Sequence, residues 1–191
     1  LQHIVEDVLD IARAQGQADA AEMHTLALDA ETAAFCAEWV HQHGASPRVR
    51  VALNTPEVQV QFAREHLRRI LVNLLDNAAR YGSERAGAIQ VATHAVRHGP
   101  AVLMVWSDGA AMEPAVRRHL FEPFFSSESR SSGLGLFICR ELCERHGASV
   151  GYERTSREQN GQIVEGNEFF VSFRRAHSGY STFNLQDTQF P

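Results

Sequence analysis

The sequence predicts an α+β fold, a two-layer α/β sandwich in which helices cover one face of a mixed, mostly antiparallel sheet. Apolar residues repeat at helical spacing over residues 64–82. Residues 88–109 alternate like two strands joined by a turn at Gly99-Pro100. A second helical pattern, at residues 131–148, opens at a pair of glycines. Helices and strands therefore alternate along the chain, which contains no internal repeat.

Shorter patterns complete the two layers. Residues 23–44 indicate a strand or turn followed by a helix that ends near Gly44, and residues 48–54 alternate with the period of a strand. Residues 148–155 and 168–176 indicate two closing strands around a polar turn.

Composition limits the class of protein. The chain has 191 residues, of which 44% are hydrophobic and 21% charged, which is enough for one main domain with a sizeable core. The formal charge is −5 and no long basic block occurs, so we expect no nucleic-acid partner. No apolar run is long enough to cross a bilayer.

The cysteines favour a reducing compartment. Cys36, Cys139 and Cys143 form neither a CxxC pair nor an even set, and the last two lie one helical turn apart. We interpret all three as buried, reduced thiols and not as metal or redox ligands.

The sequence divides into four parts. Residues 1–16 repeat apolar residues as a short helix, which fits either a partner helix or a simple core helix, and residues 17–29 form a linker. Residues 30–175 form the main domain. Residues 176–191 have no periodicity and form a loose tail.

A polar stripe follows the long helix predicted at residues 64–82. At 100° per residue, five polar side chains flank the apolar side made of Leu67, Leu71, Leu74, Leu75 and Ala78. The stripe consists of His66, Arg69, Asn73, Asn77 and Arg80. An Asn carbonyl oxygen is a hard ligand for Mg²⁺, and an Asn amide or Arg can donate to phosphate oxygens. The alternative is a helix face that is merely solvated.

Three further stretches of sequence bear on the choice between a ligand site and a solvated helix face. Asp108 ends an apolar strand and could accept a hydrogen bond from an exocyclic amine, which distinguishes adenine from guanine, although such residues usually only form turns. The aromatics of residues 120–125 are expected mainly in the core. Gly133 and Gly135 precede a helix, whose positive end and free N–H groups suit a polyphosphate.

In these residues the chain resembles the ATP-binding catalytic domain of sensor histidine kinases, in the superfamily shared with type II topoisomerases, Hsp90-type chaperones and mismatch-repair ATPases. The resemblance covers roughly residues 30 to 175. The four boxes of the family occur in family order: the N box is HLRRILVNLLDNAARYG, the first glycine box DGAAM, the F box LFEPFF and the second glycine box SSGLGLFICREL.

The resemblance implies a Bergerat fold that holds ATP and Mg²⁺ between the N-box helix and a lid at about residues 126–132. It implies that Asn77 coordinates Mg²⁺, that Asn73 and Arg80 contact phosphates, that Tyr81 packs by the adenine and that Asp108 binds the adenine amino group. Gly109, Ser132, Gly133, Leu134, Gly135 and Leu136 would line the nucleotide. The residues expected to assist phosphoryl transfer are Asn73, Arg80 and Arg130.

The resemblance also implies partners. Residues 1–15 resemble the end of the second helix of the dimerisation and phosphoacceptor hairpin. The full-length kinase would be a homodimer anchored in the inner membrane, with this domain in the cytoplasm and a response regulator as partner. The phosphoacceptor motif, His followed by Glu or Asp, is missing around His3, so we expect no self-phosphorylation. The F box and the second glycine box together, FEPFF and GLGLFICRELCE, most resemble the branch that controls type IV pilus genes.

Some positions depart from the family pattern. The first glycine box is one residue short, with Ala111 where the second glycine belongs, and a positive φ there would cost about 1 kcal/mol. Ser131 and Ser132 replace the usual Gly-Thr, and Glu128 stands where related lids often carry lysine. Arg80 replaces the usual N-box lysine.

Three functions remain open at this point. The first is a kinase catalytic domain that passes the γ-phosphoryl of Mg-ATP to a histidine on the hairpin. The second is an ATPase, but Asn73 cannot activate water as a base and Asp76 lies about 60° or more around the helix. The third is a degenerate module that binds nucleotide weakly and serves in docking or signalling.

Overall fold

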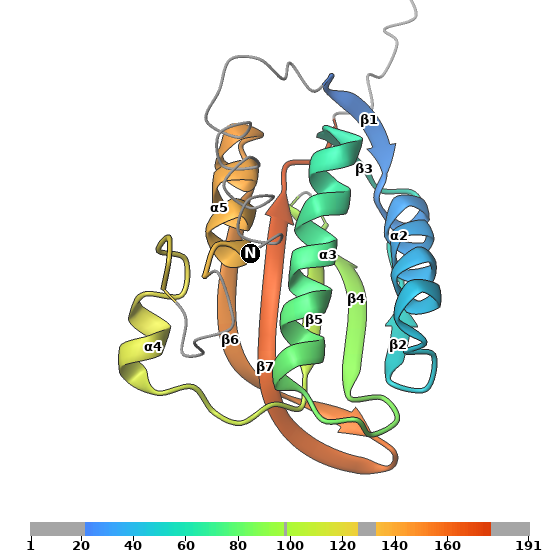
Figure 1. The fold of residues 1–191 in the computed structure, drawn as a ribbon. Coiled ribbons are helices and arrows are strands. Elements are labelled where there is room, and N and C mark those ends of the chain that lie inside the picture. The colour runs from blue at the N-terminus through green and yellow to red at the C-terminus, as the bar shows by residue number, and fades with distance from the viewer. Residues whose placement is uncertain (1–21, 98, 126–132, 177–191) are drawn as a thin grey trace, which may run out of the picture.

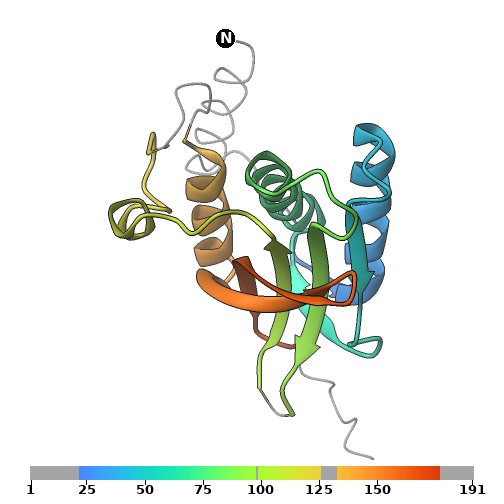
Figure 2. The same cartoon turned by 90° about the horizontal axis from the view of Figure 1, so that it is seen from below.

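The computed structural model describes residues 22–97, 99–125 and 133–176. They form the predicted α+β fold, with helices on one face of a mostly antiparallel sheet (Figures 1 and 2). No helix within these ranges is long and apolar enough to cross a membrane. The expected helix at residues 1–16 and the tail beyond residue 176 lie outside the described residues.

The main sheet has five strands in the order β2-β4-β5-β7-β6. The strands are β2 (Val49–Ala52), β4 (Ile89–Ala95), β5 (Ala101–Ser107), β6 (Ser149–Gln159) and β7 (Gln162–Phe173). Only β2 and β4 pair in parallel, and every other pair in this sheet is antiparallel. A separate two-stranded antiparallel sheet joins β1 (His24–Ala27) to β3 (Gln59–Phe62).

Among the described residues, three helices cover one face of the main sheet and a fourth lies to the side (Figures 1 and 2). The covering helices are α2 (Leu28–His43), α3 (Arg64–Tyr81) and α5 (Gly135–Arg145), and the short one is α4 (Pro114–Arg118). Helix α3 lies centrally and contacts both α2 and α5. The polar residues of α3 are therefore positioned by packing on two sides.

The buried face of α3 supplies much of the core. Its fully or nearly fully buried side chains include all five apolar residues expected there, together with Ile70. At about 25 cal/mol per Å² of apolar surface, each buried leucine contributes roughly 2 kcal/mol. The helical period in the sequence thus correctly predicts which side of α3 faces the sheet.

Several elements differ from the sequence-based expectation. Strand β3 occupies residues 59–62, for which we expected no strand, and its partner β1 begins at His24, inside the expected linker at residues 17–29. Strand β1 thus confirms the strand expected at the start of residues 23–44 and overlaps the last residues assigned to the linker. The hairpin of β6 and β7 is longer than expected and turns at Asn160-Gly161, where both φ angles are positive, 53° and 81°.

The prediction that the three cysteines are buried thiols is confirmed. Cys36, Cys139 and Cys143 are all free and buried. Burial raises the pKa of Cys36 and that of Cys139 to about 12, which makes both thiols poor nucleophiles at neutral pH.

Two histidines join α3 to the end of α5. His66 Nδ1 lies 2.7 Å from His146 Nε2, so one nitrogen must carry the shared proton and the other must accept it. The His146 ring also packs against Phe62, with centroids 4.4 Å apart. Burial, the neighbouring His66 and the charge of Arg145 lower the pKa of His146 to about 4.

This pair predicts a pH-dependent stability. Between pH 6.5 and about 4 the unfolded state binds a proton at His146 that the folded state excludes, so the free energy of unfolding should fall as pH falls through that window. Urea unfolding of wild type and His146→Gln at pH 7.5 and pH 5 should show a smaller loss in the variant. The exposed His94→Gln serves as the control and should behave as wild type. Equal losses in wild type and His146→Gln would contradict the prediction.

Candidate nucleotide site

The polar stripe of α3 lies at the edge of the core, as its sequence period predicts. The side chains of Asn73 and Asn77 are half-buried, whereas Arg80 is exposed. Asn73 Nδ2 donates to the carbonyl of Gly135, 3.2 Å away at the start of α5. No residue in the described part of the chain forms a hydrogen bond with the Asn77 amide, so its oxygen remains available to a ligand.

The start of α5 approaches this stripe closely. A Cβ added to Gly135 would lie 3.7 Å from Asn73 Cγ, so the two elements are in van der Waals contact there. Gly133 has a φ of +68°, and a Cβ on it would lie 2.7 Å from the carbonyl carbon of Phe124. Only glycine fits position 133, for both reasons.

The two leucines of the second glycine box face inward. Leu134 is fully buried, so only its backbone could contribute to a ligand site, whereas Leu136 is half-buried and packs partly against the core. Arg130 and Ser132 lie outside the described residues, as does the lid expected at residues 126–132.

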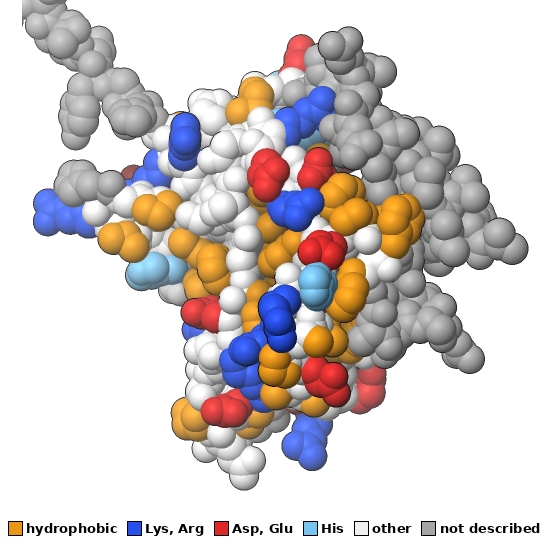
Figure 3. All heavy atoms as spheres, turned by 90° about the vertical axis from the view of Figure 1, so that its left-hand side faces the viewer, with side chains coloured by type: hydrophobic (Ala, Val, Ile, Leu, Met, Phe, Trp, Pro, Cys, Tyr) orange, Lys and Arg blue, Asp and Glu red, His pale blue; other side chains and the backbone are white. Residues whose placement is uncertain are grey.

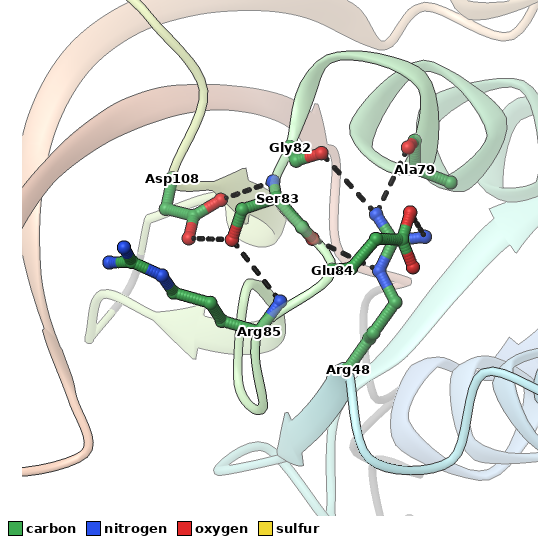
Figure 4. Close-up of polar contacts among 7 residues, drawn as sticks. All are labelled: Arg48, Ala79, Gly82, Ser83, Glu84, Arg85 and Asp108. Carbon is green, nitrogen blue, oxygen red and sulfur yellow. Dashed lines mark hydrogen bonds and ion pairs between the residues drawn. The ribbon is translucent and has the colours of Figure 1, made fainter.

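Asp108 directly follows the last residue of β5 and is held by the loop that follows α3 (Figure 4). One carboxylate oxygen, Oδ1, accepts from the Ser83 backbone N–H at 2.8 Å, and Oδ2 accepts from the Ser83 hydroxyl at 2.6 Å. Gln159 Nε2 also donates to Oδ2, at 3.0 Å. Burial would raise the pKa of Asp108, but these hydrogen bonds and the charge of Arg85 outweigh it and lower that pKa. The side chain is therefore a fixed, ionised acceptor at neutral pH.

Arg48 fixes the carboxyl end of α3 beside this carboxylate (Figure 4). Its guanidinium donates to the carbonyls of Ala79 at 3.0 Å, Gly82 at 3.5 Å and Ser83 at 3.1 Å. An ion pair of 3.0 Å with Glu84 completes the contacts. A cation at this end satisfies carbonyls that the helix leaves unpaired and opposes the negative end of its dipole.

The first glycine box is held by side chains from the last two strands. Gly109 packs so tightly that a Cβ on it would lie 2.7 Å from the Tyr81 carbonyl oxygen. Arg154 donates to the Gly109 carbonyl at 2.8 Å, and Asn167 Nδ2 donates to the carbonyl of Ala110 at 2.9 Å. The Asn167 oxygen in turn accepts from Arg154, at 3.1 Å.

Two expectations about neighbouring residues are wrong. Ala111 does not adopt a positive φ, so the expected strain at the missing glycine is absent. The last two aromatics of the F box are not core residues, since Phe124 is 70% exposed and Phe125 37% exposed. Figure 3 shows the side of the molecule on which α4 and α5 lie, where hydrophobic side chains reach the surface between charged ones.

Sequence reasoning missed five residues that shape the site. They are Arg48, Ser83, Arg154, Gln159 and Asn167. Each acts on residues of other elements through a hydrogen bond, and no local pattern marks such partners. The turn at Asn160-Gly161 was visible in the sequence and would have located the hairpin that carries Gln159.

No base for water activation is found beside Asn73 on α3. Asp76, the carboxylate closest to it along the helix, accepts a hydrogen bond of 2.8 Å from Trp39 Nε1 of α2, whereas Asn73 contacts α5. The described residues contain no group of three or more His, Cys, Asp or Glu that could hold a metal ion. A cation here would depend on the Asn77 oxygen together with oxygens of a bound ligand.

Comparison with known proteins agrees with this geometry. Residues 63–177 match the family described as histidine kinase-, DNA gyrase B- and HSP90-like ATPases. The chain is 31% identical over 161 residues to the sensor protein kinase PilS of Pseudomonas aeruginosa. The matched segment covers 83% of this chain and 29% of PilS. It is 32% identical over 167 residues to the sensor protein CutS of Streptomyces coelicolor, covering 84% of this chain and 39% of CutS. The chain thus spans well under half of these curated relatives.

Solved structures support the fold. The full-length kinase ShkA, crystallised in complex with AMPPNP, superposes with a TM-score of 0.72 at 24% identity over 91% of this chain and 35% of that chain. The catalytic domain of the histidine kinase ThkA gives a TM-score of 0.64 at 21% identity, covering 80% of this chain and 95% of that domain. The two-layer arrangement therefore occurs in a domain of nearly the same extent.

The contacts of Arg48 predict a stability defect. Arg48→Met should lower the free energy of unfolding by about 2 to 3 kcal/mol, because three carbonyls lose a charged donor. Arg48→Lys should recover only part of this loss, since an ammonium lacks the fork of donors. The matched control is Arg64→Met at the other end of α3, whose exposed pair with Glu31 should be worth about 1 kcal/mol or less. Equal destabilisation by Arg48→Met and Arg64→Met would contradict the capping role.

Proposed function

Because this chain belongs to the histidine kinase-, DNA gyrase B- and HSP90-like ATPase family, as a histidine-kinase catalytic domain, we propose that it binds Mg-ATP and donates the γ-phosphoryl group to a histidine on a separate helical hairpin. The observation that carries the proposal is the arrangement along α3. Asn73 lies midway along α3, where the start of α5 contacts it. Asp108 lies beyond the carboxyl end of α3. The rise per residue puts about 12 Å between Asn73 and Tyr81, a span that suits an extended nucleotide.

Each end of this arrangement suits a different part of ATP. Asp108 would accept from the adenine amino group, with Tyr81 beside the base and Gly109 allowing close approach. The N–H groups at the start of α5 and the side chains of Asn73 and Arg80 would donate to phosphate oxygens. Bound through the oxygen of Asn77, Mg²⁺ would neutralise developing charge on the phosphates.

The chain's own residues would act by positioning and not by acid or base chemistry. Asn73 donates a hydrogen bond but has no usable pKa, and Asp76 faces α2. This favours transfer to an external acceptor over hydrolysis. A degenerate module that binds nucleotide weakly and serves in docking or signalling is the second candidate. It is motivated by the short first glycine box, although Arg154 and Asn167 hold that loop without strain.

The relatives suggest a wider setting. The likeness to PilS supports placing the chain in the pilus-regulating branch of sensor kinases. In that setting the domain works in the cytoplasm as part of a membrane-anchored homodimer. Its phosphoryl group would pass from the hairpin to a response regulator.

The metal-ligand role of Asn77 can be tested directly. Asn77→Ala should lose most of the Mg²⁺-dependent part of ATP affinity, about tenfold or more, because the amide oxygen is the proposed protein ligand. The melting temperature should change little, since the side chain lies at the edge of the core. Titration with a fluorescent ATP analogue, with and without Mg²⁺, measures this. Unchanged Mg-ATP affinity in a folded variant would exclude the role.

Phosphoryl transfer gives the decisive test of the function. With γ-labelled ATP and Mg²⁺, this chain alone should form no acid-labile phosphohistidine and release little phosphate. A separate hairpin with the family's His-Glu motif should become labelled when added, whereas a hairpin with that His replaced by Gln should not. Brisk hydrolysis by the chain alone would favour the ATPase. Failure to bind ATP would favour the degenerate module.

A further inference from the structure

The β6–β7 hairpin extends beyond the sheet and curls across the ends of β4 and β5 (Figures 1 and 2). Near its base Trp106 Nε1 donates to the Thr155 carbonyl at 3.1 Å, and a Cβ on Gly166 would lie 2.3 Å from the Trp106 ring. The strands therefore lie directly on the indole. This contact sets the direction in which the hairpin leaves the sheet.

The tip of the hairpin is tied down on the same side. Asn160 Nδ2 donates to the carbonyl of Ala86 at 2.9 Å, and Gln90 Nε2 donates to the carbonyl of Glu158 at 2.7 Å. Arg50 adds a hydrogen bond of 2.8 Å to Asn160 Oδ1. The tip is thus fixed relative to the loop that precedes β4, which is the loop that holds Asp108.

Gln159 connects this tip to the carboxylate. It is only 4% exposed, and its Nε2 donates both to the Ala86 carbonyl, at 3.3 Å, and to Asp108 Oδ2, at 3.0 Å. Both amide hydrogens are therefore used. The Gln159 side chain cannot turn without breaking one of these bonds.

The number of acceptor positions left on Asp108 shows which ligand groups can bind there. A carboxylate offers about four lone-pair positions, two on each oxygen. Ser83 and Gln159 fill both positions on Oδ2, and the Ser83 N–H fills one on Oδ1. One acceptor position, on Oδ1, is left for a ligand. A base with an amino donor fits it, whereas the carbonyl of guanine would place an acceptor against an acceptor.

We propose that Gln159 is a specificity-determining residue of the nucleotide site, because it fixes the Asp108 carboxylate so that only a purine with an amino donor at that position binds. Gln159 is a positioning residue, since it acts through Asp108 and does not touch the base. The inference rests on the proposed function, namely that Asp108 faces the adenine of bound ATP.

The test compares ATP, GTP and inorganic tripolyphosphate as ligands in the presence of Mg²⁺. Gln159→Leu keeps most of the side-chain volume but removes the donor, so the ratio of ATP to GTP affinity should fall about tenfold while tripolyphosphate affinity stays unchanged. Asp108→Asn provides the reference, because it should reduce the same ratio at least as much. Calorimetric titration gives all three affinities.

A second variant reports on the mechanism. Gln159→Glu places another carboxyl group against Asp108, so the two groups should share a proton. Because a protonated carboxyl can donate to the guanine carbonyl, the ratio of ATP to GTP affinity should become lower at pH 6 than at pH 8. In wild type the ratio should stay constant over this range.

The matched control is Asn160→Gly, which removes a neighbouring bond to the same Ala86 carbonyl and accommodates the φ of +53°. The proposal expects an unchanged ratio in this variant. An equal fall in Asn160→Gly and Gln159→Leu would show that only hairpin anchoring matters and would overturn the proposal. An unchanged ratio in folded Gln159→Leu, with a lowered ratio in Asp108→Asn, would overturn it and leave the proposed function intact. Absence of ATP binding in wild type would overturn both.

Discussion

The burial of one face of α3 is the constraint on which the rest of the structure depends. Six of its side chains, from Leu67 to Ala78, are at most 3% exposed and pack between the sheet and the neighbouring helices. This packing fixes the rotation of the helix about its own axis. Asn73 and Asn77, a turn apart, must then lie at the margin of the core. Asn73 contacts α5, and the Asn77 amide remains available to a ligand. Apolar contacts in the core thus determine the positions of the polar site residues.

The loops of the site are held by another kind of interaction. Side-chain donors from distant parts of the chain bind backbone carbonyls: Arg48 holds the end of α3, while Arg154 and Asn167 hold the loop after Asp108. Such bonds define a loop conformation without requiring glycine. This explains how a first glycine box that lacks its second glycine retains a relaxed backbone at Ala111. The conformation depends on side chains far away in the sequence.

The difference between local apolar periods and hydrogen bonds to distant residues explains how much could be predicted from the sequence. The α3 stripe and the strands β4 and β5 follow from local periods, so their residues were identified correctly, and the four boxes indicated the family. Strand β3 was missed because its four residues follow a proline and have too short a pattern. Gln159 and Arg48 were missed for another reason. Their partners lie 51 and 31 to 35 residues away, and the chain carries no local sign of such pairs.

The long edge strand β6 has a consequence for the behaviour of the molecule in solution. With eleven residues it presents a row of backbone groups at one side of the described sheet, which is a template for pairing with another chain. Charged residues interrupt it at Glu153, Arg154, Arg157 and Glu158. In the antiparallel register that sets Glu153 opposite Glu158, a second copy would also set Arg154 opposite Arg157, and such directly opposed like charges are destabilising. Charged side chains of this kind oppose edge-to-edge pairing of the strand with another chain.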